Sequence, residues 1–206
     1  MKKAFFYGDS NTFGYDPADY YGGRYAKEKR WTSILEKALQ GEWEIAADGM
    51  PGRVIPPAGV HRTYLGKRLL ADMPFDLFGV MLGTNDLLGS GRPSAAKTAR
   101  EMEGFVDFLS ELGGFEILLI APPKIELSER SFEASYVAGG RSLAQRYRDE
   151  GRELTRLYRE LAARRGILFA DASSWDLEMA FDAVHLSEKG HETFAAQMVK
   201  VLRGIG

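Results

Sequence analysis

Cysteine is absent from the 206-residue sequence. Its absence excludes disulfide bonds, thiol catalysis and metal sites built on thiolates. Histidine is scarce: His61, His185 and His191 are the only copies, and with the scattered carboxylates they do not form a metal-binding pattern such as H-E-x-x-H. We therefore expect no metal site and no metal-dependent hydrolysis.

Long apolar runs are also missing. No segment approaches the roughly 18 apolar residues of a membrane-spanning helix, so no membrane partner is expected. The chain starts with the basic Met1-Lys2-Lys3, but the apolar run behind it covers only residues 4–7 and is shorter than the core of a signal peptide. These features predict a cytoplasmic protein.

The sequence has no excess of positive charge. Its formal net charge is -2, and no dense Lys/Arg patch with interleaved aromatic residues is present, so we expect no nucleic-acid partner. The length and the 45% hydrophobic content suit one α/β domain with a single large core. We predict that residues 1–206 form one catalytic domain.

Short apolar runs alternate with helical patterns along the whole chain. Strands are predicted at 4–7, 43–47, 75–82, 116–121 and 167–170. Helices are predicted from a capping box at Ser33 and Glu36 to Gly41, at 60–70, 94–112 and 141–165, and after a cap at Ser187. The alternation predicts a three-layer α/β/α, flavodoxin-like fold with a five-stranded parallel sheet, whose ligands bind at the carboxyl ends of the strands.

Four polar segments follow the predicted strands at that edge. They are Gly8-Asp9-Ser10, Gly49-Met50-Pro51-Gly52, Gly83-Thr84-Asn85-Asp86 and Asp182-Ala183-Val184-His185. Gly-Asp-Ser alone is usually a polar turn. Because the carboxyl ends of parallel strands lie at one edge of the sheet, however, we expect all four segments to converge there.

Together these segments contain the parts of an acyl-transfer site. A serine hydroxyl needs an adjacent base, so Ser10 is the candidate nucleophile and His185 the candidate base. Asp182 precedes His185 by three residues and is placed to orient its imidazole. The N–H groups of Ser10 and Gly52 and the side-chain amide of Asn85 are candidate donors to an oxyanion.

With these residues the chain resembles the SGNH hydrolases, also called the GDSL family of esterases and lipases. The four letters of the name fall on Ser10, a loop glycine, Asn85 and His185. Arg30-Trp31-Thr32 and the Gly-x-x-Gly-Arg loop are similar to the branch of small bacterial arylesterases and acetylesterases. The resemblance implies a carboxylic ester hydrolase that forms an acyl-enzyme and needs no cofactor.

The chain departs from the family pattern at two positions. Asn11 replaces the leucine of the GDSL signature, which we expect to be a peripheral change. Asp48 precedes Gly49 where many relatives carry asparagine, and this leaves open which glycine N–H faces the oxyanion. We prefer Gly52, with Gly49 as the alternative.

The remaining candidates concern the substrate pocket. Phe13, Tyr15 and Arg53 are candidate substrate-binding residues, and the segments free to build a pocket are 13–30 and 124–140. Because 124–140 is rich in charge, it cannot form an apolar groove for a long acyl chain, and we expect short-chain esters as substrates. A neighbouring subunit of a homo-oligomer is a candidate cover for the pocket.

We assign no catalytic role to the other polar residues near these segments. Asp9 and Asp86 are expected to be local caps, His191 to have a packing or solvent role, and His61 to have no catalytic role. The alternative functions are a carbohydrate acetylesterase, a lysophospholipase or lipase, and a flavodoxin-like module that binds phosphate or a nucleotide at residues 8–12. The last alternative leaves Asp182 and His185 without a role.

Overall fold

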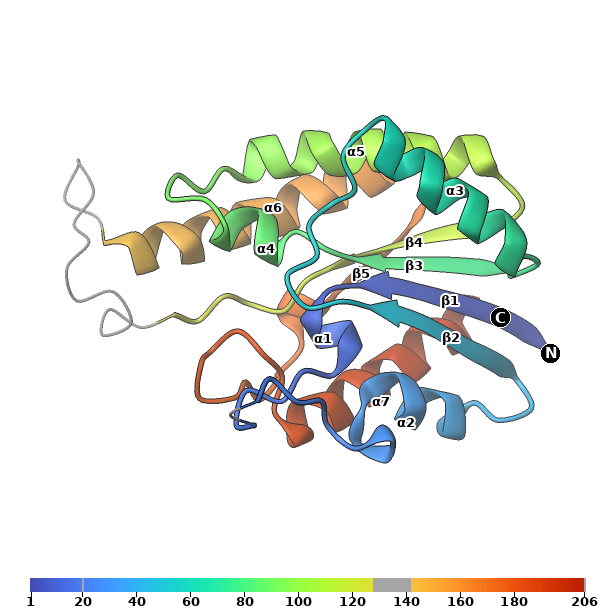
Figure 1. The fold of residues 1–206 in the computed structure, drawn as a ribbon, viewed down its shortest axis with the longest axis horizontal. Coiled ribbons are helices and arrows are strands. Elements are labelled where there is room, and N and C mark those ends of the chain that lie inside the picture. Colours follow the sequence, from blue (N-terminus) through green and yellow to red (C-terminus); the bar gives the residue numbers. More distant parts are fainter. Residues whose placement is uncertain (20, 128–141, 206) are drawn as a thin grey trace.

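A computed structural model describes residues 1–19, 21–127 and 142–205, and its central element is a parallel β-sheet (Figure 1). The strands are β1 (Lys2–Gly8), β2 (Trp43–Gly49), β3 (Leu77–Met81), β4 (Glu116–Ala121) and β5 (Leu168–Asp171). Their order in the sheet is β2-β1-β3-β4-β5, and every neighbouring pair is parallel. The predicted α/β fold with five parallel strands is confirmed.

Helices cover both faces of this sheet. The long helices are α2 (Trp31–Ala38), α3 (Val60–Asp72), α5 (Ala95–Leu112), α6 (Leu143–Arg165) and α7 (Glu188–Ile205). Short helices, α1 (Ser10–Phe13) and α4 (Thr84–Leu88), follow β1 and β3 directly, and the 3₁₀ turns Lys27–Lys29 and Ala172–Ser174 lie in connecting segments. Figure 1 shows α3, α5 and α6 on one side of the sheet and α2 and α7 on the other.

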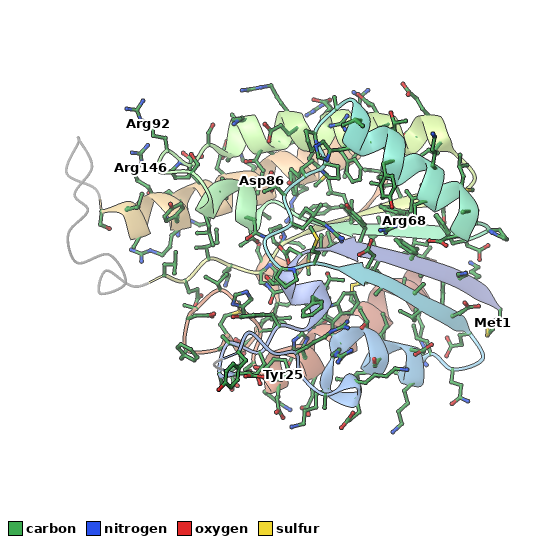
Figure 2. The ribbon with its side chains drawn as sticks, viewed as in Figure 1. Met1, Tyr25, Arg68, Asp86, Arg92 and Arg146 are labelled. Atoms are coloured by element: carbon green, nitrogen blue, oxygen red, sulfur yellow. The ribbon has the colours of Figure 1, made fainter. Side chains whose placement is uncertain are left out.

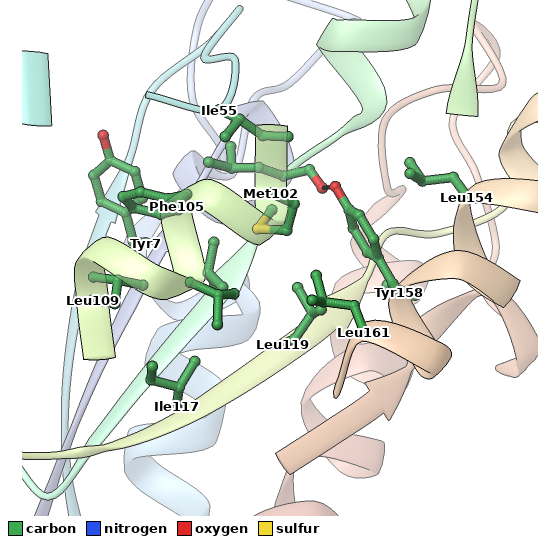
Figure 3. Close-up of a cluster of buried hydrophobic side chains, with 14 of the residues drawn as sticks. Tyr7, Ile55, Met102, Phe105, Leu109, Ile117, Leu119, Leu154, Tyr158 and Leu161 are labelled. Carbon is green, nitrogen blue, oxygen red and sulfur yellow. Dashed lines mark hydrogen bonds between the residues drawn. The ribbon is translucent and has the colours of Figure 1, made fainter. Parts of the chain in front are cut away.

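Each face of the sheet has its own hydrophobic core. Figure 3 shows part of the larger one, where Phe105 of α5 lies beside Tyr7 of β1, and Leu161 of α6 lies beside Leu119 of β4. In the second core, Trp31 lies between Phe6 of β1 and Phe194 of α7, with ring centroids 5.1 and 4.8 Å away. Burial of apolar area on both faces holds the strands in register, and the carboxyl edge is therefore a rigid platform.

The start of α2 corrects the capping-box prediction. The helix begins at Trp31, two residues before Ser33, and its N-cap is Arg30 in an extended conformation without a side-chain cap. The Ser33 N–H donates to the Arg30 carbonyl, so Ser33 already lies within the first turn. Burial of Trp31 between the sheet and α7 sets the start of this helix, and that contact has no local sequence signal.

The order of the strands creates a switch point between β1 and β3. From β1 the chain passes by α2 to β2 on one side, whereas β3, β4 and β5 follow on the other side. Crevices form at the carboxyl ends of such strand pairs. Ser10 follows β1 and Asn85 follows β3, so the two residues lie at this crevice. None of the described helices is long and apolar enough to cross a membrane.

Candidate active site

Ser10 is the first residue of the single-turn helix α1, which starts where β1 ends. Asp9 caps this helix, since its carboxylate accepts a hydrogen bond from the Asn11 N–H at 3.0 Å. The expected local cap is therefore present. The turn lies close over the end of β2, because a Cβ on Gly49 would be 2.1 Å from the backbone nitrogen of Phe13. Glycine at that position allows α1 to approach the sheet.

His185 and Asp182 come from one tight turn between β5 and α7. Asp182 Oδ1 accepts hydrogen bonds from the N–H groups of Val184 and His185, both at 3.0 Å, as in an Asx turn. Ala183 has a φ of 58°, in the left-handed region that non-glycine residues rarely adopt. The Asp182 bonds hold this unusual backbone conformation and leave Oδ2 free for the imidazole ring.

The three predicted catalytic side chains form one hydrogen-bonded chain. His185 Nδ1 lies 2.5 Å from Asp182 Oδ2, and His185 Nε2 lies 2.9 Å from Ser10 Oγ. Partial burial acts to raise the pKa of Asp182, but hydrogen bonds from His185 and Val184 outweigh it and leave that pKa below its usual value. A carboxylate that stays ionised can orient the imidazole and stabilise its protonated form.

The candidate oxyanion donors lie around Ser10. Within the described residues, neither the Ser10 N–H nor the Gly52 N–H has a hydrogen-bond acceptor. Gly52 occupies the left-handed region with a φ of 73°, inside a turn closed by the Arg53 N–H and the Met50 carbonyl at 3.1 Å. Asn85 Nδ2 donates to the Arg53 carbonyl at 3.0 Å, which leaves its second N–H free.

A surface pocket of about 410 Å³ connects these groups. It is lined by Ser10, Tyr15, Pro51, Gly52, Asn85, Leu88, Asp182, Val184 and His185. The Tyr15 ring lies against the His185 imidazole, with 4.6 Å between centroids. Gly49 is not among the lining residues, so the position of Gly52 favours it over Gly49 as the oxyanion donor.

Phe13 and Arg53, predicted at the substrate, do not line this pocket. The Arg53 guanidinium points into the protein, where it donates to the Gly8 carbonyl at 2.8 Å, pairs with Asp48 at 2.8 Å, and lies 4.1 Å from the centre of the Tyr7 ring. Asp48 also pairs with Arg68, which Figure 2 shows on the α3 side of the sheet. Buried charges need such partners, so Arg53 is occupied inside the fold.

The Phe13 ring is covered by a neighbouring side chain. The Arg24 guanidinium lies 4.2 Å from the ring centre, and its Nε donates to the Phe13 carbonyl at 2.5 Å. This arrangement places Phe13 in the packing of the 13–30 segment. Of the predicted pocket-building segment 124–140, residues 128–140 lie outside the described residues.

Two acids flank the catalytic residues, the buried Asp9 and the half-buried Asp86. Burial raises the pKa of Asp9 to about 6 and that of Asp86 to about 6. The expected local cap at Asp86 is not found, because the N-cap of α4 is Gly83 and has no side-chain cap. The Asp86 carboxylate instead accepts from the Ile55 N–H at 3.2 Å and so connects α4 to the segment after β2. Asn85 and Asp86 thus bind the backbone of Arg53 and Ile55 in that segment, and this contact has no local sequence signal.

His191 and His61 lie outside the site, as predicted. His191 is fully buried, accepts a hydrogen bond from the Trp31 N–H at 3.3 Å, and meets the Tyr25 ring edge-on. Tyr25 is on the α2 and α7 side of the sheet (Figure 2). Burial, helped by the charge of Arg30, lowers the pKa of His191 to about 4, so it packs as a neutral ring. His61 is exposed on α3.

The sequence predicts a peripheral role for Asn11, and the structure corrects this. Its side chain is buried at 3% exposure and binds the turn that carries the histidine: Nδ2 donates to the Val184 carbonyl at 3.1 Å, and Oδ1 accepts from the Leu186 N–H at 2.9 Å. In the part of the chain that the structure describes, no group of three or more His, Asp or Glu side chains is placed to hold a metal ion.

Comparison with known proteins identifies the family of this chain. The sequence profile of the GDSL-like lipase/acylhydrolase family matches residues 6–193. A putative arylesterase from Agrobacterium tumefaciens str. C58 shares 29% identity with a TM-score of 0.81, and both chains are covered completely. A carbohydrate acetylesterase family member from Sinorhizobium meliloti shares 29% identity with a TM-score of 0.80 over 100% of this chain and 99% of that one.

Two other matches carry less information about this chain. The M. smegmatis aryl esterase has a TM-score of 0.83 over the full length of both chains, and at 24% identity it supports the fold alone. An uncharacterized lipoprotein, YqeF of Bacillus subtilis (strain 168), is 35% identical over 127 residues, which are 58% of this chain and 48% of that protein. The matched region therefore spans about half the length of that curated relative.

Proposed function

Since this chain belongs to the GDSL-like lipase/acylhydrolase family, we propose that it is a serine esterase that hydrolyses short-chain carboxylic esters through an acyl-enzyme on Ser10. One observation carries the proposal. The hydrogen-bonded chain from Ser10 Oγ through His185 to Asp182, at 2.9 and 2.5 Å, opens into a pocket that also contains N–H groups without an acceptor among the described residues. Nucleophile, base and oxyanion donors are the parts that acyl transfer requires.

The proposed reaction has two steps. His185 Nε2 takes the hydroxyl proton as Ser10 Oγ attacks the ester carbonyl, and Asp182 stabilises the imidazolium that forms. The Ser10 N–H, the Gly52 N–H and the Asn85 amide bind the oxyanion. His185 then donates its proton to the departing alcohol. In the second step His185 takes a proton from water as the water attacks the acyl-enzyme. The bond between Ser10 Oγ and the acyl group then breaks, His185 returns the proton to Oγ, and the acid leaves.

The test is labelling of Ser10 with a fluorophosphonate probe, followed by peptide mapping. We expect a single modified serine at position 10 in the wild type and no labelling of Ser10→Ala. The variant should fold normally, because loss of one hydroxyl oxygen at the pocket surface leaves no core cavity. Its turnover should fall by several orders of magnitude, as is usual when a triad member is removed. Residual turnover above about 1% would contradict a nucleophilic role for Ser10.

A carbohydrate acetylesterase is the second candidate. It would use the same catalytic residues, and the 29% identical Sinorhizobium meliloti protein is a carbohydrate acetylesterase family member. A hollow of about 670 Å³ meets the catalytic pocket at Asn85, and its mixed lining includes the charged Arg92, Lys97 and Glu101. Such a surface suits a leaving group with many hydroxyls. Release of acetate from acetylated sugars, measured beside aryl acetates, separates the two substrates.

Other sequence-based expectations stay predictions. These are the cytoplasmic location, the homo-oligomer, and a small-molecule ester as the only class of partner. The phosphate-binding alternative is disfavoured by the geometry, because it gives no role to the contacts of His185 with Asp182 and Ser10. Retention of phosphate or flavin without labelling of Ser10 would restore that alternative.

A further inference from the structure

We infer that Asn11 is a positioning residue that sets the distance between His185 and Ser10. The inference deepens the proposed function and rests on it. Asn11 follows Ser10 in α1, and its side-chain amide bridges 173 and 175 residues of sequence to the two neighbours of His185. One bond goes to the Val184 carbonyl and the other comes from the Leu186 N–H, so the amide holds the backbone on both sides of the catalytic histidine.

The chemistry of these two bonds requires an amide. The side chain at position 11 must donate to a carbonyl and accept from an N–H at the same time. Both partners are backbone groups, in which the carbonyl always accepts and the N–H always donates. Leucine at position 11 provides neither group, and aspartate provides only the acceptor. The two bonds also determine which atom of the amide is oxygen and which is nitrogen.

Asn11 is itself held firmly. Its backbone N–H donates to the Asp9 carboxylate at 3.0 Å, and its backbone carbonyl accepts from the Trp31 indole N–H at 3.0 Å. Trp31 is almost fully buried in the core between the sheet and α7. The position of the Asn11 amide is thus fixed by contacts with the core, and a shift of this residue would break several buried hydrogen bonds.

The turn that carries His185 is otherwise bonded mainly to itself. The Ala180 N–H donates to the His185 carbonyl at 2.7 Å, the Ala183 N–H to the Ala180 carbonyl at 2.9 Å, and Asp182 binds Val184 and His185. Among residues 1–19, 21–127 and 142–205, the hydrogen bonds between the backbone of 180–186 and other segments are the two with the Asn11 side chain. Asp182 therefore orients the ring within the turn, and Asn11 positions the turn relative to Ser10.

Because Asp182 and Asn11 have different roles, substitutions of the two residues should have different effects. Asn11→Leu should leave the Asp182–His185 pair intact but move it relative to Ser10, so kcat should fall about 10- to 100-fold, the scale of a misplacement of about 1 Å. The KM and the midpoint of the pH–rate profile should not change. Asp182→Asn should instead change both the rate and that midpoint, because it alters the partner of the imidazole.

The first experiment measures the second-order rate of fluorophosphonate labelling at Ser10. We expect about a 10- to 100-fold loss in Asn11→Leu and a smaller loss in Asn11→Asp, which keeps the acceptor for the Leu186 N–H. The control is Asp76→Ala. The Asp76 carboxylate accepts from the Lys3 N–H at 2.7 Å at the opposite end of β1, so its loss should lower stability without lowering the labelling rate.

The second experiment is hydrogen exchange of the peptide that covers residues 179–187. Exchange in this peptide should accelerate in both Asn11 variants and not in Asp76→Ala, and this readout does not depend on any reaction of Ser10. Absence of labelling in the wild type would defeat the proposed function and leave the exchange result to test the positioning role. Unchanged labelling and exchange in folded Asn11→Asp, or a shifted pH midpoint in Asn11→Leu, would overturn the inference.

Discussion

At the scale of single residues, the site combines groups with opposite electrostatic requirements. Asp182 is kept ionised by hydrogen bonds from its own turn, whereas Asp9, directly before Ser10, is 1% exposed and has a pKa raised to about 6 by burial. The Asp9 carboxylate caps α1 and so helps to present Ser10, but it is costly to ionise in this position. Ionisation of Asp9 directly beside the proposed nucleophile therefore lowers the stability of the folded protein.

Asp9→Asn should stabilise the protein, and more so as the pH rises. The carboxyl group ionises near pH 3.9 in the unfolded chain and near pH 6 in the folded one, so the unfolded state loses its proton first and wild-type stability falls between these values. Asparagine keeps an oxygen to accept from the Asn11 N–H and does not ionise. Its advantage should grow by on the order of 2–3 kcal/mol between pH 4 and pH 7.

Urea unfolding of wild type and Asp9→Asn at several pH values checks this prediction. The difference in free energy of unfolding between the two proteins isolates Asp9 from the other titrating groups. It should rise through pH 4 to 6 and then level off. A difference that is independent of pH would show that Asp9 ionises normally in the folded protein.

At the scale of elements, the segment after β2 has two glycines with different duties. A Cβ on Gly49 would meet the Phe13 backbone nitrogen at 2.1 Å, and backbone cannot move aside without moving α1. A Cβ on Gly52 would meet nothing within 4 Å, although its φ of 73° disfavours other residues. Gly49 therefore allows an element to pack, and Gly52 allows a turn.

The same substitution at these two positions should have unequal effects. Gly49→Ala should lower the free energy of unfolding by about 3 kcal/mol or more and reduce turnover, because α1 and Ser10 must shift. Gly52→Ala should cost about 1–2 kcal/mol from the left-handed backbone alone. Chemical denaturation and turnover of both variants test the pair. Equal losses in stability would show that α1 does not rest on Gly49.

At the scale of the whole molecule, the connection after β5 has to cross the sheet. β5 is an edge strand and β1 lies three positions away, yet His185 follows β5 and Ser10 follows β1. The chain returns over the carboxyl edge because α7 packs in the same core as α2, and the turn with Asp182 and His185 lies on that return path. The order of the strands and the docking of α7 therefore assemble the catalytic residues.

The overall form of the pocket predicts which esters are turned over fastest. The pocket is open, has a volume of about 410 Å³, and is lined by several polar residues beside Tyr15, Leu88 and Val184. A long acyl chain needs a continuous apolar groove, in which each buried methylene adds about 0.8 kcal/mol. We therefore expect kcat/KM for p-nitrophenyl esters to be highest at about two to four carbons. Values that climb beyond about eight carbons would favour the lysophospholipase or lipase alternative.

Local patterns in the sequence were enough to locate the strands, most helices and the candidate catalytic residues. Apolar runs that stop at glycine mark buried strands and their ends, and parallel strands end at one edge, so Ser10, Asn85, Asp182 and His185 were expected together. A serine nucleophile also needs a base and oxyanion donors, and this requirement assigns a role to each residue. Residue types and strand ends, on which the prediction depends, are both visible in the sequence.

Only the tertiary structure decided the supporting contacts. Asn11 looked peripheral because its partners lie 173 and 175 residues away, and Arg53 looked available to substrate because its ion pair with Asp48 and its contact with Tyr7 form only when β1 and β2 align. The early start of α2 follows from the burial of Trp31 against α7. Each of these contacts depends on which residues, far apart in the sequence, meet in the fold to form a buried hydrogen bond or to fill a space in the core. The period of the apolar residues and the spacing of the motifs contain no information about that.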